Sequence, residues 1–318
     1  MPTLTGCLES CESPGGTGSE VGRVGNEGES LGDENFRNFL VALRGGKPKT
    51  VKYHPEKCLH AELFDASNWS RWLDPRLSKV LEEWHRTGDL KQVDLDAAAL
   101  DLQALAPGIF SFPCFTADFC RKILEEVKNY QRSGLPERPP NSMNNQGLVL
   151  NEIGLLPLFD ELLSKVLSPL AARLFGDDND RLLSLKGQKT IGNWGGSHLD
   201  KHHTFVVQYS AKDDTHLDMH IDECDITFNI GLSESETFQG NQLVFCGLYD
   251  ADDHRKHQLT YRHVLGQCVV HCGKQRHGAV DIEEGERVPG PSPVRGMYTA
   301  PKNPLRVEDK RLLFPSNK

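Results

Sequence analysis

The stretch HLDMHIDECDITFNIGL, residues 216–232, places a histidine and an aspartate two positions apart, directly before an alternating apolar run. Within DITFNIGL, residues 225–232, every second residue from Ile226 onward is isoleucine, phenylalanine or leucine, which is typical of a strand with one buried face. On an extended chain, residues i and i+2 project from the same face. His220 and Asp222 are therefore predicted to present an imidazole and a carboxylate side by side, a pair suited to iron, zinc or manganese.

Other short apolar segments suggest a sheet around this strand. They are TFVVQYS (204–210), NQLVFCGLY (241–249) and GQCVVH (266–271), each rich in β-branched or aromatic residues. Before residue 181 the apolar period is helical, in segments 74–88, 112–136 and 155–175. Helices followed by strands predict an α+β domain, with the helices on one face of a mainly antiparallel sandwich or barrel.

The ends of these helices carry recognisable signals. Asp74 and Thr116 are predicted N-caps, while Gly88 and Gly134 are predicted to end the same two helices. Pro169 lies inside the third periodic segment and is predicted to kink or break it, because proline lacks the N–H that the helix uses.

Composition and charge limit the possible partners and cellular location of the protein. The 318 residues carry a net charge of −9, which argues against nucleic acid or an anionic membrane surface as the main partner. The nine cysteines form no CxxC pair, so neither a disulfide framework nor a structural zinc site is predicted. With no secretory signal and no membrane-spanning apolar run, we expect a cytoplasmic or nuclear protein.

A second motif supplies candidates for a third metal ligand. The segment HCGKQRHGAVDIEEGERV, residues 271–288, contains His271 and His277, and Arg287 stands ten residues after His277. Either histidine would complete a set of three ligands and leave coordination positions open for a co-substrate and dioxygen.

Together, His220-x-Asp222, a distal histidine and the later arginine resemble the 2-oxoglutarate- and Fe(II)-dependent dioxygenases, in particular their prolyl 4-hydroxylase-like branch. The segments FTADFCRKILEEV, NSMNNQGLVL and ETFQGNQLVFCGLY extend the likeness over about residues 112–288. The resemblance implies a double-stranded β-helix, or jelly-roll, core. It also implies that His220, Asp222 and His277 ligate Fe(II), with His277 preferred to His271 because of the ten-residue step to Arg287.

The same resemblance implies a co-substrate and a reaction. Arg287 would pair with the far carboxylate of 2-oxoglutarate, and Tyr209 would hydrogen-bond the same molecule. Dioxygen and 2-oxoglutarate would be consumed, with release of succinate and carbon dioxide, while a peptidyl proline or lysine or a small molecule is hydroxylated. Ascorbate is expected as an additional ligand, and neither nucleic acid nor a membrane is an expected partner.

The chain departs from the family pattern after Val288. Pro289, Pro291 and Pro293 cannot donate ladder hydrogen bonds, so an interior strand is not expected there and the final strand of the core would be missing. The expected organisation is a disordered segment 1–35, a helical or irregular region 36–111, the dioxygenase domain 112–288 and a divergent Pro-rich tail 289–318.

Two alternatives stay open at this point. The altered C-terminus could leave a catalytically impaired metal-binding scaffold of the same fold. The same two histidines and aspartate could also serve a zinc-dependent hydrolase, although the sequence contains no HExxH motif to supply a general base.

Overall fold

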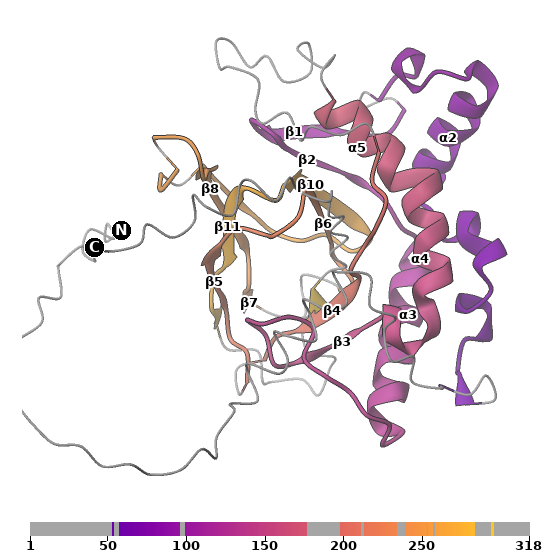
Figure 1. Ribbon diagram of the computed structural model, residues 1–318, viewed down its shortest axis with the longest axis vertical. Helices are drawn as coiled ribbons and strands as arrows, with labels where there is room; N and C mark the ends of the chain where they lie inside the picture. Colours follow the sequence, from indigo (N-terminus) through magenta and orange to yellow (C-terminus); the bar gives the residue numbers. More distant parts are fainter. Residues whose placement is uncertain are drawn as a thin grey trace, which may run out of the picture.

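The computed structural model describes residues 53, 57–95, 99–176, 198–210, 213–233, 239–252, 254–256, 258–283 and 294–295. Within these residues every paired strand is antiparallel, and the four α-helices precede most of the strands (Figure 1). The predicted α+β class is therefore confirmed. No helix in the described part of the chain is both long enough and apolar enough to span a membrane.

The helices begin where the sequence signals place them. In α2 (Pro75–Thr87) the Asp74 side chain accepts a hydrogen bond from the Arg76 amide, and Gly88 ends the helix at a φ of 74°. In α3 (Ala117–Arg132) the Thr116 hydroxyl accepts from the Phe119 amide, which confirms the predicted cap.

The third helical segment changes its hydrogen-bonding pattern along its length. α4 (Leu156–Leu162) passes into a π-helical stretch, Leu163–Leu167, before α5 (Ser168–Phe175) begins. Pro169 lies in the first turn of α5, where an N–H is least needed. The interruption predicted at Pro169 thus takes the form of a π-helical stretch directly before it.

Two four-stranded sheets form the centre of the molecule. The first has the order β1-β2-β10-β6 and the second the order β5-β11-β8-β9, with small sheets β12-β7 and β13-β4-β3 beside them. The strands are β1 (Gln103–Ala106), β2 (Ile109–Pro113), β3 (Gly147–Val149), β4 (Phe205–Gln208), β5 (Leu217–His220), β6 (Ile226–Ile230), β7 (Gln239–Gly240), β8 (Leu243–Leu248), β9 (Leu259–Tyr261), β10 (Gln267–Cys272), β11 (Gln275–Ala279), β12 (Ile282–Glu283) and β13 (Val294–Arg295).

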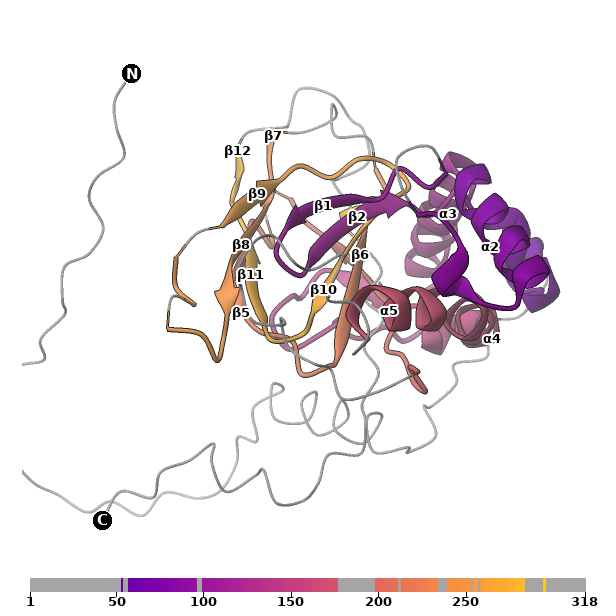
Figure 2. The ribbon, with the colours of Figure 1, turned by 90° about the horizontal axis from the view of Figure 1, so that it is seen from above.

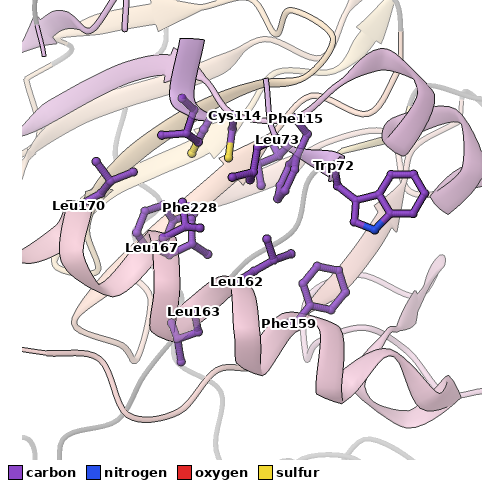
Figure 3. Packing of buried hydrophobic residues seen from close by; sticks show 14 of the residues in the cluster. Trp72, Leu73, Cys114, Phe115, Phe159, Leu162, Leu163, Leu167, Leu170 and Phe228 are labelled. Carbon is purple, nitrogen blue, oxygen red and sulfur yellow. The ribbon is translucent and has the colours of Figure 1, made fainter. Parts of the chain in front are cut away.

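The helices cover one face of the first sheet, as Figures 1 and 2 show. Ile226, Phe228 and Ile230 of β6 belong to the same buried apolar cluster as the inward residues of all four α-helices. Figure 3 shows Leu162 and Leu167 gathered with Phe228 between helix and sheet. Burial of this apolar surface is the main stabilisation of the fold.

The other face of the first sheet meets the second sheet. Ile109 of β2 and Val269 of β10 share a buried cluster with Leu243 and Phe245 of β8. Because β6 lies between the helices and the second sheet, all five of its residues are buried. The sequence pattern predicted a half-buried strand, and this is wrong: the polar residues of β6 face the space between the sheets rather than solvent.

The predicted outer segments lie largely outside the described residues. This applies to residues 1–35, to Arg287 and to most of the tail 289–318. Within that tail, Val294–Arg295 pairs with β4 at the edge of its small sheet, directly after Pro293. The boundary predicted between residues 111 and 112 falls inside β2, so the segment before it contributes strands to the first sheet.

A buried carboxylate anchors the N-terminal segment to α3. Glu126 is fully buried and accepts hydrogen bonds from the Tyr53 hydroxyl, the His60 amide at 2.8 Å and the Asn129 side chain at 3.3 Å. A buried charge is tolerated when several donors satisfy it. None of the cysteines that the structure describes forms a disulfide bond.

Candidate metal centre

Strand register brings two distant histidines together. In the antiparallel pair of β5 and β11, His220 lies directly opposite His277, and their ring centroids are 4.3 Å apart. Leu217 pairs with Ala279, so three residues of β5 span the same distance as two of β11, and β5 contains a bulge. The bulge lets Leu217 and His220 both face inward although they are three residues apart, while Met219 is exposed.

Asp222 reaches the histidines by a different route from the one the sequence predicted. β5 ends at His220, so Asp222 lies beyond the strand and not on an extended alternation. Its amide donates to the Gly273 carbonyl at 2.9 Å, and the Gly273 amide donates to the Asp225 carbonyl, also at 2.9 Å. Gly273 lies in the short turn between β10 and β11, where a Cβ would lie 2.0 Å from the Cys224 oxygen. The turn and the Asp222 segment can approach this closely only because residue 273 is glycine.

The three side chains converge on one point. The Nε2 atom of His220 lies 3.3 Å from Oδ1 of Asp222, and Nε2 of His277 lies 3.5 Å from Oδ2. One ligand atom from each residue lies within 4.8 Å of the other two. Ligands held at about 2.1 Å from one ion and at right angles to each other would be about 3 Å apart, so a small contraction would let all three bind one metal.

The hydrogen bonds of the imidazoles show that the set fits a cation. His220 Nδ1 lies 2.7 Å from the Asp218 carbonyl, and His277 Nδ1 lies 2.9 Å from the Gln275 carbonyl. A carbonyl oxygen only accepts, so each Nδ1 carries the proton. The buried Nε2 of His277 has no hydrogen-bond partner, and in the neutral ring its lone pair faces a carboxylate oxygen. Two acceptors this close repel each other unless a cation beside them offsets their negative charge.

The charge states favour metal ligation as well. Burial lowers the pKa of His277 to about 3, against the attraction of Asp222, so this imidazole is neutral near neutral pH. Burial would raise the pKa of Asp222, but His277 and His220 outweigh it and hold that pKa well below its usual range. For His220, the hydrogen bond and charge of Asp222 outweigh burial and raise the pKa. The set thus combines a carboxylate with imidazoles that a metal can bind when they are unprotonated.

Two further side chains support Asp222. The Thr227 hydroxyl of β6 donates to Oδ2 of Asp222, and the Cys224 sulfur lies 3.2 Å from the same hydroxyl oxygen. Burial raises the pKa of the Cys224 thiol well above its ordinary value, so it stays protonated.

His271, the rival third ligand, lies beside the site without joining it. Its ring is fully buried on β10, with its centroid 4.5 Å from that of His277 and 5.2 Å from that of Phe245. Its Nδ1 donates to the Cys272 carbonyl at 2.8 Å, and its Nε2 lies 3.2 Å from the Asn229 amide nitrogen. The convergent set therefore contains His277 and not His271.

Two neighbouring residues, Tyr209 and Asp218, lie outside the candidate metal-ligand set. Tyr209 is fully buried in a cluster with Leu217 of β5 and Ala279 of β11, so it lies against the two strands that carry the histidines. Asp218, two residues before His220, has an exposed side chain that pairs with His216 at 3.4 Å and does not belong to the ligand set.

Sequence reasoning missed Thr227, Asn229 and Gly273 as parts of this site. Thr227 and Asn229 are the polar positions of the alternating run, which predicts that they face solvent. The available signal was that both are small, uncharged hydrogen-bonding residues in a strand close after a His-x-Asp pair.

Comparison with known proteins places the chain in a family of oxygenases. The family model of the OGFOD2-like domain matches residues 51–180. The chain is similar to "2-oxoglutarate and iron-dependent oxygenase domain-containing protein 2" of Mus musculus, with 37% identity over 273 residues, covering 84% of this chain and 67% of that protein. Against the protein of the same name from Xenopus tropicalis, identity is 35% over 260 residues, covering 81% of this chain and 64% of that protein.

The chain belongs to the 2-oxoglutarate and iron-dependent oxygenase domain-containing protein 2 family. This confirms the resemblance of the sequence to the 2-oxoglutarate- and iron-dependent oxygenases. The chain spans about two-thirds of the length of these relatives. Among solved structures, it bears a distant likeness to a Pseudomonas putida prolyl-4-hydroxylase, with a TM-score of 0.37 and 13% identity over 73% of this chain and 97% of that one.

Proposed function

We propose that this protein is an Fe(II)- and 2-oxoglutarate-dependent dioxygenase that hydroxylates its substrate and releases succinate and carbon dioxide. The observation that carries the proposal is the convergence of His220, Asp222 and His277 around a buried, unpartnered Nε2 atom. Family membership supports it, because the relatives are named for dependence on 2-oxoglutarate and iron.

When bound, the iron and its co-substrate would supply the oxidation chemistry. The residues of this chain supply geometry. His220, Asp222 and His277 would hold the metal from one side, and the carbonyls of Asp218 and Gln275 keep both imidazoles turned with Nε2 toward it. The rings of Phe245 and His271 pack on the fully buried His277 and keep water away from its side of the site.

We interpret the two facing four-stranded sheets as the double-stranded β-helix of this enzyme class. The shared cluster of β2, β10 and β8 supports this, because it joins the inner faces of both sheets. In this arrangement Tyr209 and Arg287 would bind 2-oxoglutarate, and ascorbate would be a further ligand. The substrate would be a peptidyl proline or lysine, or a small molecule.

The direct test is anaerobic titration with Fe(II) and then 2-oxoglutarate, followed by visible absorbance. A chelated 2-oxoglutarate on iron gives a weak charge-transfer band, which we expect for the wild type. His220→Ala should abolish the band. His216→Ala is the matched control, because His216 lies on the same segment but is exposed and outside the ligand set, and it should keep the band.

The outcomes separate the remaining alternatives. Folded wild-type protein that binds no Fe(II) would overturn the proposal. Iron binding without a 2-oxoglutarate band would favour the metal-binding scaffold, and hydrolytic turnover with Zn²⁺ alone would favour the zinc hydrolase. Succinate released in proportion to 2-oxoglutarate consumed, in air, would establish the activity.

A further inference from the structure

The hydroxyl of Thr227 is committed to one oxygen of the candidate ligand Asp222. A carboxylate only accepts, so the single hydroxyl proton of Thr227 must point to Oδ2. The neighbouring Cys224 thiol, 3.2 Å from the hydroxyl oxygen and 3.5 Å from the Ile226 carbonyl, has acceptors on both sides and does not take the hydroxyl proton from Asp222. Oδ1 of Asp222 faces His220 at 3.3 Å and has no such hydroxyl donor among the contacts of the described residues, whereas Oδ2, which lies 3.5 Å from Nε2 of His277, accepts from Thr227.

The strand fixes Thr227 in this position. Ile226, Phe228 and Ile230 of β6 pack into the core under the helices, so Thr227 and Asn229 project from the opposite face. Thr227 pairs across the ladder with His271, whose ring packs on His277. With an exposure of 1%, the Thr227 side chain has no access to bulk water that could replace its hydrogen bond to Asp222.

We propose that Thr227 is a positioning residue that makes Asp222 a one-oxygen ligand, an inference that rests on the proposed function. The hydrogen bond from the hydroxyl makes Oδ2 a weaker metal ligand and keeps it in its present position. Oδ1 then becomes the oxygen that binds the metal. With two imidazoles and one carboxylate oxygen bound, about three positions of a six-coordinate ion stay open for co-substrate and dioxygen. A carboxylate bound through both oxygens would close one of them.

The substitution Thr227→Val tests this, because it removes the hydroxyl while nearly preserving shape. Mn²⁺ serves as the probe, since the water protons that exchange on the bound ion can be counted by nuclear relaxation. We expect the relaxation enhancement of the bound ion to fall by about one third in Thr227→Val, as three water sites become two. Thr227→Ser keeps the hydroxyl and should retain the wild-type enhancement.

Thr204→Val is the matched control. Thr204 is also a fully buried threonine, and its hydroxyl lies 2.7 Å from Nδ1 of His202, a residue outside the ligand set. The same chemical change there should leave the relaxation of bound Mn²⁺ unchanged, even if stability falls. Circular dichroism would confirm that each variant is folded before the titration.

The results separate this inference from the proposed function. If wild-type protein binds no Mn²⁺, the proposed metal centre fails. If the wild type and Thr227→Val bind Mn²⁺ with the same enhancement, the proposed function stands and the role of Thr227 is refuted. Should Thr227→Val not fold, Thr227→Ala and Thr227→Ser carry the test: the alanine variant must show the same fall of about one third in the enhancement, and the serine variant must not.

Discussion

Replacing Gly273 by alanine should displace Asp222 without touching any ligand. The new Cβ would lie 2.0 Å from the Cys224 carbonyl oxygen and 3.0 Å from that of Asp222, whereas ordinary contact begins at 3.4 Å. The segment 222–225 must therefore retreat from the turn by about 1.4 Å. Both atoms are backbone, so no side-chain rotation can relieve the contact.

The size of the effect follows from the two hydrogen bonds at this turn. A shift of this size breaks or badly stretches the bonds Asp222 N–H to Gly273 O and Gly273 N–H to Asp225 O. At about 0.5–1.5 kcal/mol each, their loss lowers the free energy of unfolding by about 1–3 kcal/mol. Displacement of a ligand from its supporting partner should weaken metal binding about 10- to 100-fold.

Two measurements check this prediction: urea-induced unfolding of the metal-free protein, and calorimetric titration with Mn²⁺. Gly176→Ala is the control, because its Cβ would lie 2.4 Å from the Ala172 oxygen at the end of α5, far along the chain from the metal ligands. It should destabilise the fold and leave the Mn²⁺ affinity of the folded protein unchanged. If Gly273→Ala matched the wild type in both measurements, the turn would not be what holds Asp222 in place.

Three other perturbations probe separate parts of the molecule. Metal at 100 times its dissociation constant should stabilise the protein by about 2.7 kcal/mol in thermal melting, and His277→Ala or a chelator should remove that gain; equal melting temperatures would contradict it. Glu126→Ala should cost about 2–4 kcal/mol in urea unfolding because buried donors lose their acceptor, whereas Glu125→Ala, at a partly exposed carboxylate, should cost less than about 1 kcal/mol. Burial lowers the pKa of His203 from 6.5 to about 4, so between these two pH values the unfolded chain binds more protons at His203 than the folded protein does. The contribution of His203 to stability should thus be constant above pH 6.5 and fall by about 3 kcal/mol toward pH 4, so His203→Gln should lose that much less stability over this range than the wild type; an identical pH profile would refute this.

The helices were predictable because their signals are local. Asp74 and Thr116 accept hydrogen bonds from amides two or three residues away, and such contacts are visible in sequence as spacing. β11 was harder, because QRHGA, residues 275–279, has no alternating apolar pattern. Its strand conformation comes from hydrogen bonds to β5 and β8, far away in the chain.

The candidate site was predictable as a set of residues but not as an arrangement. His220 and Asp222 were predicted to meet by strand alternation, yet the bulge in β5 and the turn at Gly273 are what bring them together. Alternation also shows which residues share a face without showing what that face meets. Thr227 and Asn229 were for that reason assigned to solvent, although a second sheet covers them.

The two backbone hydrogen bonds at Gly273 affect how Asp222 can move away from a bound metal ion. The turn continues β10 of the first sheet into β11 of the second, and it holds the Asp222 segment through both its N–H and its C=O. Any motion that carries the Asp222 backbone away from a bound ion must break these two hydrogen bonds, so that route of metal release shares a step with local unfolding. The amide protons of Asp222 and Gly273 are therefore kinetic reporters, and their exchange with deuterium should slow together when the centre is filled.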